Sequence, residues 1–155
     1  MEDYNKIIES LSVRFDKSKN IRILQPVRID NYYDIKNSLI YLHKGEIRFR
    51  EGDEFKSAFG EQMLFIPGGK PNSIIFGSGD PKSLSNDDFI ENKELYFQSL
   101  ETRDVKNLDA EVFTFVNFEA KIFDSVNFFG SLNIPPFVIE VNDTIKHLLE
   151  EISER

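Results

Sequence analysis

The sequence predicts a mostly β domain: a jelly-roll barrel of short strands with a short helix at the N-terminal end and a second helix at the C-terminal end. Apolar and polar residues alternate in several short runs, and Gly, Pro, Asn and Asp separate these runs. The period changes to that of a helix only near the two ends of the chain. At 155 residues we expect one domain, with an N-terminal arm over 1–20, the barrel over 21–141 and the last helix over 142–155.

Composition excludes several kinds of site. The chain has no cysteine, so we expect no disulfide, no thiolate nucleophile and no zinc–thiolate site. A formal net charge of −8 argues against binding of this chain to the phosphate backbone of a nucleic acid, because such binding requires clustered Lys and Arg. No apolar run is long enough to span a bilayer, and we expect a cytoplasmic protein with no membrane contact. The 15 phenylalanines predict a phenylalanine-rich core or an aromatic-lined cavity.

The N-terminal part is expected to begin as a helix and to continue as an edge strand. Residues 3–11 carry four apolar side chains at helical spacing, which are Tyr4, Ile7, Ile8 and Leu11. The following run RILQPVRI, residues 22–29, is extended in character. Pro26 interrupts it and cannot donate a backbone hydrogen bond, so we expect an edge strand or a bulge there.

Two strand pairs are predicted next. Residues 38–51 alternate on both sides of a Lys-Gly turn, which is typical of a hairpin. The runs MLFIP and SIIFG form a second pair around a Pro-Gly-Gly turn. The segment 77–94 is rich in Gly, Ser, Asp and Asn, and we expect a long mobile surface loop.

The C-terminal half is expected to supply the remaining strands and a helix. Strands are predicted over 95–101 and 111–123, with Phe113 and Phe115 on one face of the second. Residues 125–141 contain an apolar turn, a Pro-Pro break and a last extended piece. The tail 142–155 has an apolar stripe at helical spacing, made of Ile145, Leu148, Leu149 and Ile152.

The stretch from Leu39 to Asn72 resembles the cupin barrel, a double-stranded β-helix. Gly45 matches the glycine of the first cupin motif, and Pro67 and Gly69 match the Pro-x-Gly turn of the second. In metal-binding cupins these motifs also supply three histidines and a glutamate. On this alignment the ligand positions hold Ser38, Asn72 and either Asn31 with Tyr33 or Tyr32 with Asp34. Because no imidazole remains, we expect a metal-free barrel without a cofactor.

A second resemblance covers residues 38–155. The ordered segments LIYLHKGEIRF, MLFIPGGKPN, FTFVNFEAKIF and LNIPPFVIEV, followed by a helix, are similar to the sensing and dimerisation domain of AraC-type transcription regulators. That family has a Leu-Pro segment before its last strand, and here two residues separate Leu132 from Pro135. The resemblance implies an unidentified small-molecule effector and a homodimer whose seam is the stripe of Ile145, Leu148, Leu149 and Ile152. It implies DNA contact only through a helix-turn-helix domain that this chain lacks.

Inward-facing side chains of such a barrel would bind the effector. The candidate lining residues are Tyr41, His43, Phe49, Phe65, Asn72, Phe113 and Phe115. Tyr41 and Asn72 are the polar selectors among them, and His43 shares the face of Tyr41 by strand alternation. If Phe49 points inward, its arginine neighbours are solvated and the cavity is apolar. If an arginine points inward instead, it would select a carboxylate or a phosphate.

We therefore predict a ligand-sensing domain and no enzyme. One alternative is a free-standing metal-independent cupin enzyme, such as a sugar isomerase or epimerase. Its acid–base group would be His43 with Tyr41 or Asp34. Another alternative is a protein-interaction module, which would have a filled barrel without a cavity.

Overall fold

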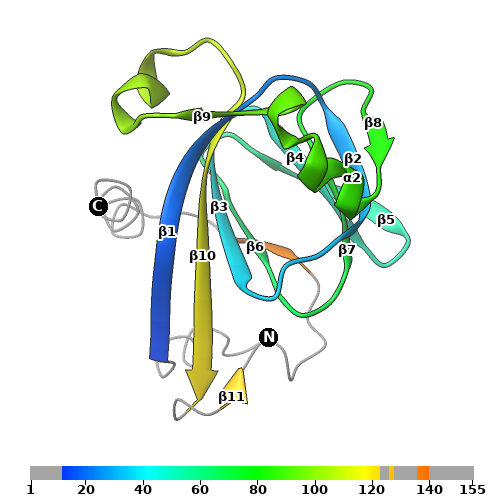
Figure 1. Ribbon diagram of the computed structural model, residues 1–155, viewed down its shortest axis with the longest axis vertical. Coiled ribbons are helices and arrows are strands. Elements are labelled where there is room, and N and C mark those ends of the chain that lie inside the picture. Colours follow the sequence, from blue (N-terminus) through cyan, green and yellow to red (C-terminus); the bar gives the residue numbers. More distant parts are fainter. Residues whose placement is uncertain (1–11, 123–125, 128–135, 140–155) are drawn as a thin grey trace.

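The computed structural model describes the backbone of residues 12–122, 126–127 and 136–139. The helices expected over 3–11 and 142–155, including Ile145, Leu148, Leu149 and Ile152, lie outside these residues. Within them the chain is mostly β, as predicted, and its strands form two facing sheets of jelly-roll type that do not close into one barrel (Figure 1). No described helix is long and apolar enough to cross a membrane.

The larger sheet contains seven of the described strands. Its order is β12 (Phe137–Ile139), β6 (Met63–Ile66), β3 (Asn37–Lys44), β10 (Val112–Ile122), β1 (Ser12–Ile23) and β9 (Phe97–Leu100), with β11 (Val126–Asn127) paired to the far end of β10. All these pairings are antiparallel. The strand β1 begins within the stretch assigned to the arm from sequence, and its register with β10 shifts between Phe15 and Ser18.

The smaller sheet has five described strands. Its order is β5 (Glu54–Phe59), β4 (Glu46–Glu51), β7 (Asn72–Phe76), β2 (Val27–Tyr32) and β8 (Lys82–Leu84). Only the β2–β8 pair is parallel. Three short helices complete the described structure, namely α2 (Asn86–Glu91), η1 (Lys93–Leu95) and η2 (Thr102–Asn107).

Both predicted hairpins are wrong. The strands β3 and β4 follow one another in the chain, but β3 pairs with β6 and β10, whereas β4 pairs with β5 and β7. The turn at Gly45, with φ of 108°, carries the chain from one sheet to the other. The runs MLFIP and SIIFG became β6 and β7, which likewise belong to different sheets. Each turn that looked like a hairpin connects the two layers.

The predicted mobile loop over 77–94 is also wrong, because that segment contains β8, α2 and the start of η1. Ser85 caps α2 by accepting a hydrogen bond from the backbone N–H of Asp88, and acidic residues occupy the first turn. Phe89 of α2 is buried against the core. Figure 1 shows α2 beside β2 and β8, so the segment covers one end of the sandwich.

The core lies between the sheets and follows strand alternation. Ile47 and Phe49 of β4 are buried, as the inward orientation requires. Arg50 is exposed, whereas Arg48 is half-buried and donates to the carbonyls of Gly77 and Gly79 at 3.0 and 2.8 Å. Alternation thus predicted the apolar face correctly, and one arginine is used to fix the β7–β8 connection.

Candidate functional site

A pocket of about 940 Å³ opens beneath α2 and η1, between the two sheets. Its walls come from β1, β2, β7, β9 and β10, from the β2–β3 connection and from the α2–η1 segment. This volume is within the range of small-molecule sites in proteins. The pocket therefore has room for a ligand of substantial size.

The floor of the pocket is aromatic. Phe113 of β10 lies 5.7 Å from Phe76 and 5.5 Å from Phe97, measured between ring centroids. Phe89 of α2 approaches Phe97 edge-on at 5.1 Å. The first of these pairs is stacked and the other two are edge-to-face, and both arrangements stabilise aromatic clusters. The floor, which also includes Ile21 and Phe115, would exclude water from an apolar group placed on it.

The rim of the pocket is polar and mostly cationic. Its charged residues are three lysines, Lys19, Lys36 and Lys93, and one carboxylate, Asp34. In a chain with a net charge of −8, this local excess of cations is unusual. Such a group of ammonium ions attracts anions into the pocket.

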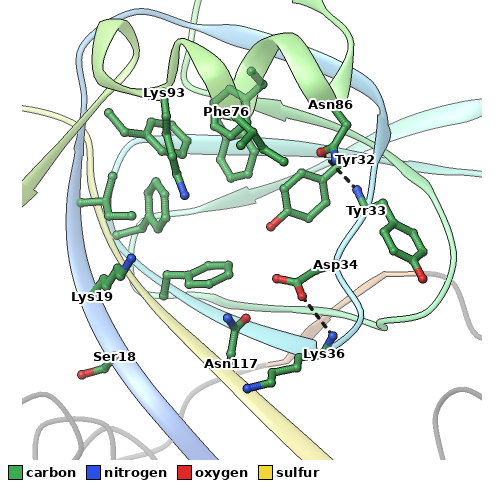
Figure 2. Close-up of a pocket in the computed structure, with 16 residues that line it drawn as sticks. Ser18, Lys19, Tyr32, Tyr33, Asp34, Lys36, Phe76, Asn86, Lys93 and Asn117 are labelled. Atoms are coloured by element: carbon green, nitrogen blue, oxygen red, sulfur yellow. Dashed lines mark hydrogen bonds between the residues drawn. The ribbon is translucent and has the colours of Figure 1, made fainter.

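Lys19 and Lys93 are the cations that turn into the pocket. Figure 2 shows the Lys93 amine reaching in from η1 and the Lys19 amine turning in from β1. Among the described residues, neither lysine has a carboxylate within ion-pair distance. Burial lowers the pKa of Lys93, repulsion from Lys19 lowers it further, and attraction to Asp34 opposes the change. An anion between the two amines would remove that repulsion.

A hydrogen-bonded set of side chains lies on the opposite wall. The Tyr32 hydroxyl is bonded to Ser38, and Ser38 donates to Asn117 Oδ1 over 3.2 Å. Burial raises the pKa of the Tyr32 hydroxyl, and the nearby Asp34 carboxylate raises it further. Tyr32 therefore stays a neutral hydrogen-bonding group at physiological pH.

The Pro-Gly-Gly turn holds the charged segment of the β2–β3 connection in place. The Gly69 N–H donates to the Asp34 carbonyl at 2.9 Å, and the Gly68 N–H donates to Asn37 Oδ1 at the same distance. A Cβ on Gly68 would lie 2.5 Å from the backbone of Ile35 and Lys36, so only glycine fits. In this structure the cupin-like turn supports a pocket wall.

Two asparagines attach α2 to β2. The Asn86 N–H donates to Asn31 Oδ1 at 2.9 Å, and the Tyr33 N–H donates to Asn86 Oδ1 at 3.3 Å. This reciprocal pair positions the start of α2 above the pocket, and Figure 2 shows the second of these bonds. The position of Lys93 follows, because η1 comes directly after α2.

The candidate residues from sequence separate into three groups. Phe113 and Phe115 line the pocket. Phe49 is buried in the core between the sheets but does not line it, and Asn72 bonds the carbonyls of its own turn at Pro67 and Lys70. The other three are Tyr41, His43 and Phe65, which lie on the opposite face of the larger sheet. Their roles in ligand binding stay predictions.

Sequence reasoning missed the lysines. Lys19 falls in the predicted N-terminal arm and Lys93 near the end of the predicted loop, and no local pattern of the sequence connects them. Three residues that align with metal-ligand positions of cupins belong to the pocket or bond to it. Tyr32 and Asp34 line the pocket, and Ser38 bonds Tyr32. Among the described residues, no group of three or more His, Cys, Asp or Glu side chains could hold a metal ion.

No protein-family model and no curated protein matches the sequence. Among solved structures, the apo form of a lysine-to-alanine variant of ToxT from Vibrio cholerae strain SCE256 matches with a TM-score of 0.51 and 6% identity, over 94% of this chain and 48% of that one. Wild-type ToxT with an unsaturated fatty acid bound matches with a TM-score of 0.48 and 8% identity, over 100% of this chain and 48% of that one. This chain thus spans about half the length of ToxT, and the first likeness shows a shared fold.

Proposed function

We propose that this chain is the ligand-sensing domain of an AraC-type transcription regulator, and that its pocket binds a small organic anion with an apolar body. The observation that carries the proposal is the position of two amines, Lys19 and Lys93, in a pocket with aromatic lining; neither amine has a carboxylate within ion-pair distance among the described residues. A floor of phenyl rings binds the apolar body through the hydrophobic effect. Ammonium groups bind a carboxylate through charge-assisted hydrogen bonds.

The regulator part of the proposal is supported by fold and by sequence order. ToxT, whose fold this chain shares, is an AraC-family regulator. The succession of segments between residues 38 and 155 is similar to the sensing domain of that family. We infer that DNA is read by a separate domain, and that the stripe beginning at Ile145 forms a homodimer seam. A ligand would act by favouring one of two arrangements of these parts.

The geometry favours this function over the two alternatives. His43 bonds Thr114 on the outer face of the larger sheet, whereas Asp34 lies in the pocket. His43 does pack edge-on against Tyr41, with 4.7 Å between the ring centroids, but neither residue lines the pocket, so the acid–base group suggested for an isomerase lies away from the ligand space. A plain interaction module would have a filled interior, but this sandwich contains a large pocket.

Calorimetric titration tests the ligand class. Octanoate and 1-octanol have similar apolar tails, and only octanoate is charged. We expect octanoate to bind the full chain at least tenfold more tightly, because each ammonium–carboxylate hydrogen bond contributes roughly 1.5–3 kcal/mol. The double variant K19A/K93A should lose this preference.

A matched variant separates the effect of the pocket lysines on octanoate affinity from the effect of net charge. Lys82 is exposed on β8 and outside the pocket, so K82A removes one positive charge and leaves the lining intact. Octanoate should bind K82A as it binds the unmodified chain. Equal affinities for octanoate and octanol, or equal losses in K82A and K93A, would overturn the anion proposal.

The regulator proposal has its own test. The chain can be fused to a DNA-binding domain that represses a reporter only as a dimer. Repression that responds to added octanoate, and no longer responds in K19A/K93A, is the expected result. A fusion that never represses would contradict the dimer, and repression that octanoate does not change would contradict sensing.

A further inference from the structure

Lys93 combines a basic nitrogen, apolar surroundings and a neighbouring cation. Its amine points into the pocket toward Lys19 (Figure 2), and the lining of the same pocket includes Phe97 and Phe113. Part of the Lys93 side chain stays exposed, so a ligand can reach the nitrogen from solvent. A lysine that is desolvated or placed beside another cation loses its proton more readily, and the neutral amine is a nucleophile.

We propose that Lys93 forms a reversible imine with aldehydes that carry an apolar tail, and that Lys19 donates the proton required by the carbonyl oxygen. The inference rests on the proposed function, because the same floor would hold the tail. It adds a covalent mode of capture to a pocket that otherwise binds its ligand by charge and burial.

The proposed step balances without an oxidant or a reductant. The Lys93 lone pair forms a C–N bond to the carbonyl carbon, and the carbonyl π electrons move to oxygen, which takes a proton from the Lys19 ammonium. The nitrogen then loses a proton, returned to Lys19 through water. The Lys19 ammonium then protonates the hydroxyl group, which leaves as water while the nitrogen lone pair forms the C=N bond, and the resulting iminium returns its proton to Lys19 through water. One aldehyde and one amine thus give one imine and one water.

Among the described residues, two surface lysines outside the pocket, Lys44 and Lys56, lack this setting. Lys44 forms an ion pair with Asp109, and Lys56 forms one with Glu51. Their amines are engaged by a carboxylate on the surface and have no apolar floor beneath them. The geometry therefore predicts reaction in the pocket rather than at these two surface lysines.

Trapping with borohydride tests the proposal. The full chain is incubated with octanal near neutral pH and reduced with sodium borohydride, and the adduct is located by mass spectrometry of peptides. We expect one predominant octyl adduct, on Lys93. The K93R variant should lose it, K82R should keep it, and K19A should form it about tenfold or more slowly because the proton donor is gone.

Octanoate provides a second readout on the unmodified chain, in case K93R does not fold. Excess octanoate should suppress the adduct, because both molecules would occupy one floor. Adducts spread over surface lysines would overturn the proposal, and so would an adduct that persists in excess octanoate although calorimetry shows that octanoate binds. Octanoate binding without any adduct would refute imine formation at Lys93 and would still support anion binding in the pocket. An adduct on Lys93 without octanoate binding would support the imine and refute the anion pocket.

Discussion

The Nε2 atom of His43 lies 2.6 Å from the hydroxyl oxygen of Thr114, on the face of β3 turned away from the pocket. Thr114 donates its single hydroxyl proton to Asn20 Oδ1, also over 2.6 Å. The hydroxyl must therefore accept from His43, which fixes a proton on Nε2. Asn20 donates in turn to Thr102 Oγ1 at 3.3 Å. A continuous set of bonds thus connects β3, β10, β1 and η2.

Replacing Thr114 with valine should destabilise the fold by about 1–3 kcal/mol, because His43 and the buried Asn20 each lose a partner while the shape is kept. Urea unfolding measures the change. The control is S99A, because Ser99 is exposed on β9, and we expect its free energy of unfolding to change by no more than roughly 0.5 kcal/mol. Octanoate affinity should be the same in both variants, because Thr114 faces away from the pocket. A T114V chain as stable as S99A would show that the network contributes nothing.

Strand faces were predictable from sequence, and strand partners were not. The alternation of Phe113 and Phe115 with Thr114 is a local property with a period of two residues, and the structure confirms it. The choice of partner depends on segments far along the chain. At Gly45 the local signal was the same for a hairpin and for a crossing between sheets, and packing against β10 selects the crossing.

The charged half of the site was beyond the reach of sequence patterns. Lys19 and Lys93 line the same pocket because β1 and the α2–η1 segment border it. No periodicity in the sequence indicates that these two residues lie close together. The helix α2 did leave a signal. Ser85 followed by Asp87 and Asp88 is a capping pattern, but the six-residue helix lies in a segment whose composition is typical of loops.

Glu111 should be a stabilising residue outside the site. Its carboxylate accepts from the Glu46 N–H at 3.1 Å, from the Ser78 N–H at 3.0 Å and from the Ser78 hydroxyl at 2.7 Å. We expect E111A to lower the free energy of unfolding by about 2 kcal/mol or more, because hydrogen bonds to a charged acceptor are strong. E54A removes the same charge from an exposed position and is the control. Equal stabilities of the two variants would contradict this role.

The two glycines of the cupin-like turn should differ in their effect on binding. A Cβ at Gly68 would meet the backbone at Ile35 and Lys36, so G68A should displace that wall and weaken octanoate binding several-fold, with a clear loss of stability. Gly69 has φ of 85° and open space around it. G69A should cost about 1–2 kcal/mol through backbone strain and leave octanoate affinity nearly unchanged. Calorimetry on both variants measures the octanoate affinity. A larger loss of affinity in G69A than in G68A would contradict the role of Gly68 in supporting the pocket wall.

Octanoate binding should weaken as the pH rises through the lowered pKa of Lys93. In the free pocket, burial and Lys19 favour the neutral amine, whereas a bound carboxylate favours the ammonium. Binding therefore takes up a proton between the lowered pKa and the raised pKa of the complex, and the Kd increases with pH across that window. K93R keeps its charge there, so its Kd should not show this increase. Titrations from about pH 7 upward, repeated in buffers of different ionisation enthalpy, measure both the Kd and the proton uptake. Identical pH profiles for the unmodified chain and K93R would exclude Lys93 as the titrating contact.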